Sequence, residues 1–177
     1  MTHAWKLGPG LREVPVEPAG FAAEVDRILD EITSARSQPA RLLATLVEAA
    51  PLLRIAGRLE ESRKTAAAAI ALAELVEDPV SAFRARLALA QVMHREGRYE
   101  LATPLFDQLI GQARSTPQLA PFLHDVLFHA GQNLFDQNRM PEAARCFRES
   151  HALRREAGMD ELLELSAEAV RVTRAPG

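Results

Sequence analysis

The 177-residue chain has little cysteine and no long apolar run. Its single cysteine, Cys146, excludes an internal disulfide framework and fits a reducing compartment. No stretch approaches the roughly 18 uninterrupted apolar residues of a membrane-spanning helix. Residues 1–20 also lack the apolar run of a secretory signal. We therefore expect a cytoplasmic protein with no membrane association.

Aromatic residues and an excess of one charge are also scarce. The net charge is −3, whereas nucleic-acid binding normally needs a basic patch that neutralises phosphates. Aromatic residues make up only 5% of the chain, while alanine and leucine are abundant, and this mixture favours helices over sheets. The composition therefore argues for a helical protein and against nucleic acid as its main ligand.

A short pattern recurs three times with a period of about 40 residues. Its copies are GRLEES at Gly57–Ser62, GRYELA at Gly97–Ala102 and NRMPEA at Asn138–Ala143. A fixed period in this range is typical of stacked helical repeats, in which each unit leaves an apolar face that its neighbours cover. Such a stack presents a surface, so the repeat argues for a scaffold and against an enzyme with a deep pocket.

Local signals place the helices around these copies. Asp78 and Thr116 each precede a proline, and they are natural N-caps because proline suits a first helical turn. Gly57, Gly97 and Asn138 stand where a helix should stop in a left-handed residue. The signals predict helices at 39–56, 79–96 and 117–137. Apolar residues at helical spacing predict partner helices at 59–76, 99–114 and 141–157.

Short loops between these helices predict three antiparallel hairpins. Residues 19–36 and 160–173 add an N-terminal and a C-terminal capping helix, and the charged outer face of the latter suits the exposed end of a stack. Residues 1–18 are rich in glycine and proline, so we expect an extended or disordered arm before a repeat domain at 19–174. Apolar residues in the arm, including Trp5 and Leu11, leave an ordered arm open. We hypothesise that it lies across the binding surface of its own or another copy.

The residues around the second and third copies resemble tetratricopeptide repeats. The matching residues are Leu89-Ala90, Gly97-Arg98-Tyr99, Ala102 and Phe106 in one repeat, and Leu127, Ala130-Gly131, Met140, Ala143 and Phe147 in the next. The period exceeds the family's unit of about 34 residues by about six residues, which lengthens each helix by about one turn, as in the long repeats of bacterial regulators and signal-sensing proteins. The resemblance implies an all-α fold, a right-handed α-solenoid of three such hairpins between two capping helices.

The resemblance also implies a binding surface, because the first helix of each hairpin lines the concave side in this family. Carried over to this chain, the groove consists of Arg84, Leu87, Gln91, His94, Arg95, Phe128, His129, Gln132 and Phe135. Phe128 and Phe135 would anchor a peptide, and Gln91 and Gln132 would grip its backbone through donor and acceptor together. The alternative is that Leu87 and Phe128 pack between hairpins and that both glutamines are solvated.

No catalytic, cofactor-binding or metal-binding pattern occurs in the sequence. Cys146 lies on an apolar helix face, which indicates a buried thiol. Asp125 and His129 are four residues apart, which indicates a surface ion pair. We therefore expect no enzyme activity, no cofactor and no metal, and a protein or peptide partner on the concave surface. A regulatory sensor of a short peptide or small ligand, and a self-assembling scaffold such as a homodimer, stay open as alternatives.

Overall fold

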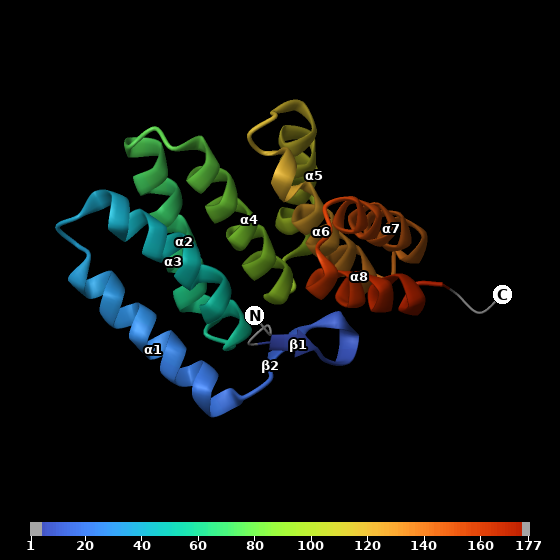
Figure 1. Ribbon diagram of the computed structural model, residues 1–177, viewed down its shortest axis with the longest axis horizontal. Coiled ribbons are helices and arrows are strands. Elements are labelled where there is room, and N and C mark those ends of the chain that lie inside the picture. Colours follow the sequence, from blue (N-terminus) through green and yellow to red (C-terminus); the bar gives the residue numbers. More distant parts are fainter. Residues whose placement is uncertain (1–4, 175–177) are drawn as a thin grey trace. The chain divides into compact units, whose positions relative to one another are not determined.

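The computed structural model describes residues 5–174, which are all-helical apart from one short strand pair (Figure 1). The all-α class is therefore confirmed. The helices are α1 (Pro18–Ser34), α2 (Pro39–Ile55), α3 (Leu59–Leu75), α4 (Pro79–Arg95), α5 (Tyr99–Ser115), α6 (Leu123–Asp136), α7 (Met140–Glu156) and α8 (Asp160–Val172). Strands β1 (Trp5–Leu7) and β2 (Glu13–Pro15) form a two-stranded sheet around a 3-10 turn at Pro9–Leu11. Within residues 5–174, no helix is long and apolar enough to cross a membrane.

The chain divides into two compact units. The N-terminal unit spans Val14–Arg98 and contains α1 to α4. The C-terminal unit contains α5 to α8 together with the start of the chain up to Glu13. The division falls between α4 and α5, which are the two helices of the second predicted hairpin. The continuous stack of three hairpins therefore stays a prediction.

Local chemistry sets where the helices begin. Prolines occupy the first turn of α1, α2 and α4, and Asp78 caps α4 as predicted. Its Oδ1 accepts the backbone N–H groups of Ser81 and Val80 at 2.9 and 3.1 Å. These bonds, with one from the Ser81 hydroxyl, lower the pKa of the Asp78 carboxyl. The charged cap stabilises the positive end of the helix dipole.

The start of α6 was predicted wrongly. The helix begins at Leu123 and not at residue 117, after a 3-10 turn at Ala120–Phe122. Thr116 does not cap it; its carbonyl accepts the N–H groups of Leu119 and Ala120 and closes a turn. The physical reason is a second proline, because Pro121 has no N–H with which to continue a helical ladder from this turn.

Each copy of the repeated pattern begins at a helix stop. Gly57, Gly97 and Asn138 have φ angles of 78°, 74° and 60°, as predicted for left-handed residues. In each case the next N–H reaches back across the turn, as from Arg58 to the Leu53 carbonyl at 2.9 Å. This is the Schellman arrangement, in which the last free carbonyls of a helix are satisfied by the chain that leaves it. The repeated sequence pattern therefore corresponds to the same helix-ending turn in all three places.

The N-terminal unit has a core rich in alanine. Helices α2, α3 and α4 meet through small and aliphatic side chains, and the buried ones are Leu43, Leu46, Val47, Ala69, Ala73, Ala82 and Ala85. A second cluster joins Ala50, Ala66 and Ala88. The close approach allows the buried Ser62 hydroxyl on α3 to donate to the Ala50 carbonyl on α2 at 2.6 Å. Small residues therefore fix the spacing of these helices.

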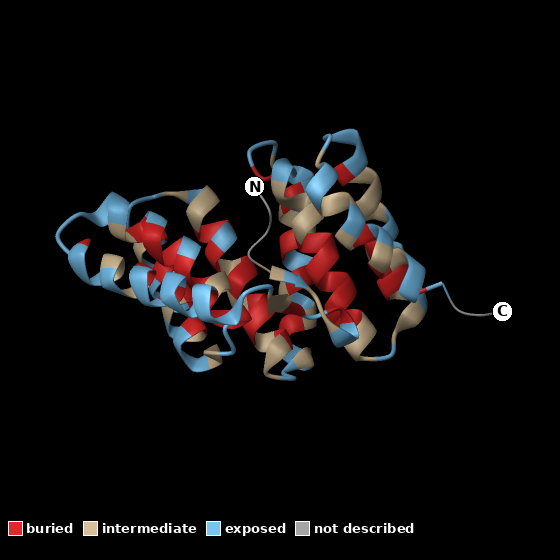
Figure 2. Cartoon of the chain, turned by 60° about the horizontal axis from the view of Figure 1, so that its bottom comes forward, coloured by how far each residue is buried: buried red, intermediate tan, exposed pale blue. Residues whose placement is uncertain are grey.

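The C-terminal unit is packed around aromatic rings. Phe128 on α6 and Phe147 on α7 are fully buried, with ring centroids 5.6 Å apart. Leu11 belongs to the same cluster, with Leu134, Ala143 and Ala169. Gly131 lies under Phe147, since a Cβ there would come within 2.6 Å of the ring. Buried residues lie on the inward sides of the helices within each unit (Figure 2).

Candidate functional site

The predicted groove residues on α4 are mostly buried within the N-terminal unit. Leu87, Gln91 and His94 are at most 6% exposed, Arg95 is half-buried and Arg84 is exposed. Gln91 is therefore not a solvated side chain. Its Oε1 is buried and has no hydrogen-bond partner among the described residues. Buried amide oxygens are usually hydrogen-bonded, so this oxygen is an unsatisfied acceptor.

The predicted groove residues on α6 lie together in the C-terminal unit. Phe128, His129 and Gln132 are buried, and Phe135 is half-buried. They are covered by the chain's own N-terminal segment, which forms β1, the 3-10 turn and β2 over residues 5–15. Residues 1–4 of the predicted arm lie outside the described residues. Residues 11–13 of the arm contact α6 of their own chain, and the hypothesis that the arm lies across a binding groove stays a prediction.

Three consecutive residues of the arm contact α6. The Leu11 side chain packs in the Phe128 cluster, and the Leu11 carbonyl accepts a hydrogen bond from Nε2 of Gln132. Arg12 lies 3.5 Å from Asp136 on the last turn of α6. Leu11 has a φ of 59°, which turns the chain sharply at this point. Gln132 therefore binds a backbone carbonyl of its own chain, and its predicted contact with a partner peptide stays a prediction.

The next arm residue, Glu13, reaches His129. Glu13 is only 2% exposed, and its Oε1 lies 3.7 Å from His129 Nε2. The same nitrogen lies 3.4 Å from Asp125 Oδ1, while His129 Nδ1 lies 2.6 Å from Gln132 Oε1. Gln132 uses its NH₂ group on Leu11, so its oxygen faces the ring and His129 Nδ1 donates. All three neighbours of the ring, Glu13, Asp125 and Gln132, present acceptor oxygens to it.

Arg154 on α7 contacts this cluster through Phe128 and His124 of α6. Its side chain is 1% exposed and its guanidinium lies 4.4 Å from the centroid of the Phe128 ring, a cation–π contact. Nη1 donates to the Leu162 carbonyl at 3.2 Å, and Nε donates to Nδ1 of His124 at 3.3 Å. His124 accepts at Nδ1, so its ring proton is on Nε2. Arg154 therefore joins α6, α7 and α8 around one charge.

Charge and burial act in opposite directions here. Burial alone would raise the pKa of Asp125, but the charges of His129 and Arg154 outweigh it and lower that pKa. Burial lowers the pKa of Arg154 and of His124, because it disfavours their charged forms. The Asp125–His129 ion pair was predicted at the surface. This was wrong for the histidine, whose side chain is 7% exposed because the arm covers it.

Two members of the cluster were missed from the sequence. Glu13 gave no signal, because its partner lies more than a hundred residues away and belongs to another element. Arg154 did give one. It lies seven residues after Phe147 and four after Ser150, on the stripe of α7 that is buried. A charge in an apolar stripe indicates a buried polar contact.

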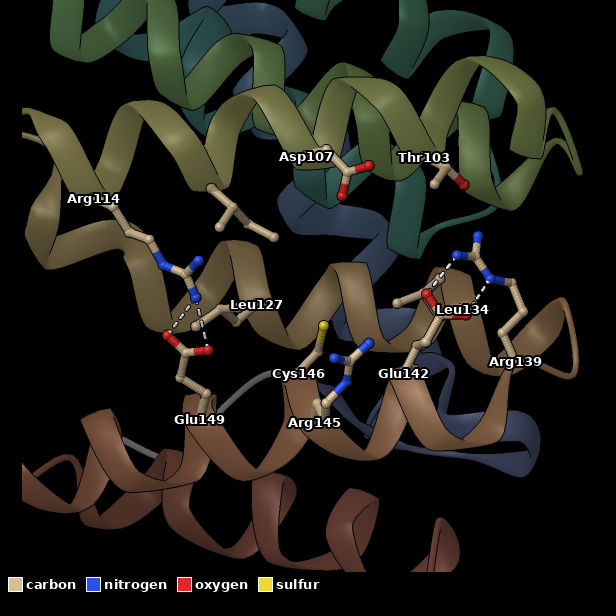
Figure 3. Close-up of a pocket in the computed structure, with 11 residues that line it drawn as sticks. Thr103, Asp107, Arg114, Leu127, Leu134, Arg139, Glu142, Arg145, Cys146 and Glu149 are labelled. Carbon is tan, nitrogen blue, oxygen red and sulfur yellow. Dashed lines mark hydrogen bonds and ion pairs between the residues drawn. The ribbon is translucent and has the colours of Figure 1, made fainter.

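A separate pocket of about 310 Å³ lies between α5 and α7 (Figure 3). Leu127 and Leu134 of α6 contribute apolar lining. Two ion pairs lie at its sides, Arg114 with Glu149 at 2.7 Å and Arg139 with Glu142 at 2.6 Å.

Cys146 also lines this pocket, and it is half-buried. Burial raises the pKa of its thiol, which keeps the thiol protonated at neutral pH. A protonated thiol among paired charges makes the pocket a poor place for nucleophilic chemistry.

Within residues 5–174, no three acidic, cysteine or histidine side chains are grouped so that they could hold a metal ion. No family model matches the chain, and a search of curated proteins finds no relative.

Proposed function

We propose that the protein is a non-enzymatic interaction module, similar to tetratricopeptide repeats, that binds peptide segments of partner proteins on α6 of one unit and on α4 of the other. The observation that carries the proposal is the contact between α6 and the arm. A non-helical segment lies on this helix through one buried leucine, one amide-to-backbone hydrogen bond and two ion pairs. These are the elements with which folded domains recognise peptides.

The chemistry of α6 divides recognition into two parts. Gln132 binds a backbone carbonyl, which every peptide offers, so this contact contributes affinity without sequence preference. The Phe128 cluster, Asp136 and His129 contact side chains, so they select the sequence. The helices that hold these groups are already packed, and a preformed surface reduces the ordering cost of binding.

A second observation supports the same role for α4. Gln91 follows Leu87 by four residues, as Gln132 follows Phe128. The buried Oε1 of Gln91 lacks a hydrogen bond, which costs about 1–3 kcal/mol in a folded protein. A peptide N–H would recover that cost once the Gln91 side chain turns outward to meet it. We propose that Gln91 is the open counterpart of Gln132.

Selection from a random displayed-peptide library, followed by calorimetry, tests the proposal. We expect Gln91→Ala to weaken the selected peptides about 3- to 10-fold, the range of one hydrogen bond. The matched control is Gln108→Ala, since Gln108 is exposed on α5 and should leave affinity unchanged. Gln91→Ala removes an unsatisfied group, so its thermal stability should not fall. The proposal is wrong if no peptide is selected, or if both variants bind like wild type.

A further inference from the structure

We propose that Leu11–Glu13 is an internal ligand, which occupies α6 in place of a partner segment with the same order of side chains: apolar, basic, acidic. The inference rests on the proposed function. It names both the class of partner for the α6 face and the contact that keeps other segments out.

Helix α6 contacts all three residues. Leu11 enters the cluster of Phe128, Arg12 pairs with Asp136, and Glu13 reaches His129. Gln132, between them, holds the Leu11 carbonyl and so fixes the register of the segment. A segment with acid and base exchanged would bring like charges together at Asp136. The α6 face is therefore complementary to one order of charges.

The buried charges show what a replacement must supply. Without Glu13, the His129 ring would lose its most buried acidic neighbour. Without an apolar side chain at the Leu11 position, the Phe128 cluster would open to water. A partner must therefore bring an acid and an apolar group at the same spacing, because a buried group left unpaired costs more than its bond contributes.

The arm is held by few contacts, so it can be displaced. Its sheet has only two strands of three residues, and an isolated pair of strands is marginal in water. The Arg12 side chain is 51% exposed, so its ion pair contributes little. Of the three arm residues that contact α6, only Leu11 and Glu13 are buried. Because the arm and α6 belong to one chain, the arm is present at an effective concentration in the millimolar range. A free peptide must compete with that effective concentration.

A fluorescent peptide of residues 5–17, WKLGPGLREVPVE, tests the inference on full-length protein. Leu11→Asp should release the arm, since it places a charge among buried rings. Val16→Asp is the matched control, because Val16 is 45% exposed on the same segment. Anisotropy should show at least tenfold tighter peptide binding by Leu11→Asp than by wild type or Val16→Asp. A peptide with Arg12 and Glu13 exchanged should bind weakly to all three.

Two readouts keep the test decisive. The chain has one tryptophan, Trp5 on β1, so its emission should shift to the red when the arm leaves α6. Far-ultraviolet circular dichroism reports whether the helices persist. If Leu11→Asp loses its helices, Glu13→Lys takes its place, because it removes the buried acid that faces His129.

Three results overturn the inference. One is a released arm with no gain in peptide affinity, and another is equal binding by wild type and variant. In either case the library selection still judges the proposed function through Gln91 and other peptides. The third is a doubled mass in sedimentation that depends on Leu11, which would assign the α6 face to the arm of a second copy.

Discussion

The helices of the two units end in the same left-handed turns, but the residues that pack between the helices differ. In the N-terminal unit the helices meet through alanine, and the buried amide oxygen of Gln91 has no hydrogen bond among the described residues. In the C-terminal unit they meet through phenylalanine, and both ends of the Gln132 amide are bonded. The second unit is completed by a segment from the far end of the chain, and the first shows what such a face lacks without one.

The difference indicates which part of the molecule carries specificity. The turns at Gly57, Gly97 and Asn138 are nearly interchangeable, because each only has to end a helix. The groups around His129 are not, because each buried charge needs a particular neighbour. The helices therefore form a general frame, and the buried polar groups make one face selective.

The largest expected effect tests the charged support under α6. Arg154→Ala removes the cation–π contact and the bond to Leu162, and it leaves Asp125 without one of its cations. We expect a loss of about 3 kcal/mol or more in the free energy of unfolding. Arg155→Ala, at the exposed neighbour, should change it by less than about 0.5 kcal/mol. Urea denaturation measures both, and equal losses would contradict a structural role for the buried arginine.

A smaller effect separates the two kinds of core. Gly131 and Ala90 each precede an inner-face glutamine, but Phe147 fills the space above Gly131. Gly131→Ala should destabilise by about 1–3 kcal/mol through overpacking, less the gain in helix propensity. Ala90→Gly should lose about 1 kcal/mol, chiefly from propensity. Thermal melts compare them, and a more stable Gly131→Ala variant would show that the ring moves aside freely.

The smallest effect depends on pH. The lowered pKa of Asp125 means that its ion pairs contribute stability above the unfolded value of about 3.9, and that this contribution is lost as pH falls through the folded pKa. Asp125 is 39% exposed, so we expect Asp125→Asn to cost under about 1 kcal/mol at pH 6. The gap to wild type should close in strong acid. Urea denaturation at pH 6 and pH 2.5 measures the difference in the free energy of unfolding between wild type and variant. A difference that grows on acidification would contradict a stabilising Asp125 carboxylate.

The helices could be predicted from the sequence because their limits are local. Most of them begin and end within a residue or two of their predicted positions, where a cap, a proline or a left-handed residue acts on its own neighbours. The start of α6 failed where Pro121 disturbed that local pattern. Local signals are strong when one residue decides the outcome.

The candidate site could be predicted only in part, because its contacts are not local. Gln132 was identified as a backbone grip, and the arm was one of its possible ligands. The burial of the α6 face and the role of Glu13 could not be predicted, because both depend on contacts between residues more than a hundred positions apart. Neither composition nor periodicity records such a pairing, which follows from how the whole unit folds.

The place of Leu11 has a consequence for synthesis of the chain. A ribosome makes this residue long before it makes Gln132, so the arm leaves the exit tunnel with nothing to cover. The Leu11 side chain therefore stays exposed to water and chaperones until α6 and α7 have formed. Leu11 thus reaches its buried position only after the helices that it contacts have been made.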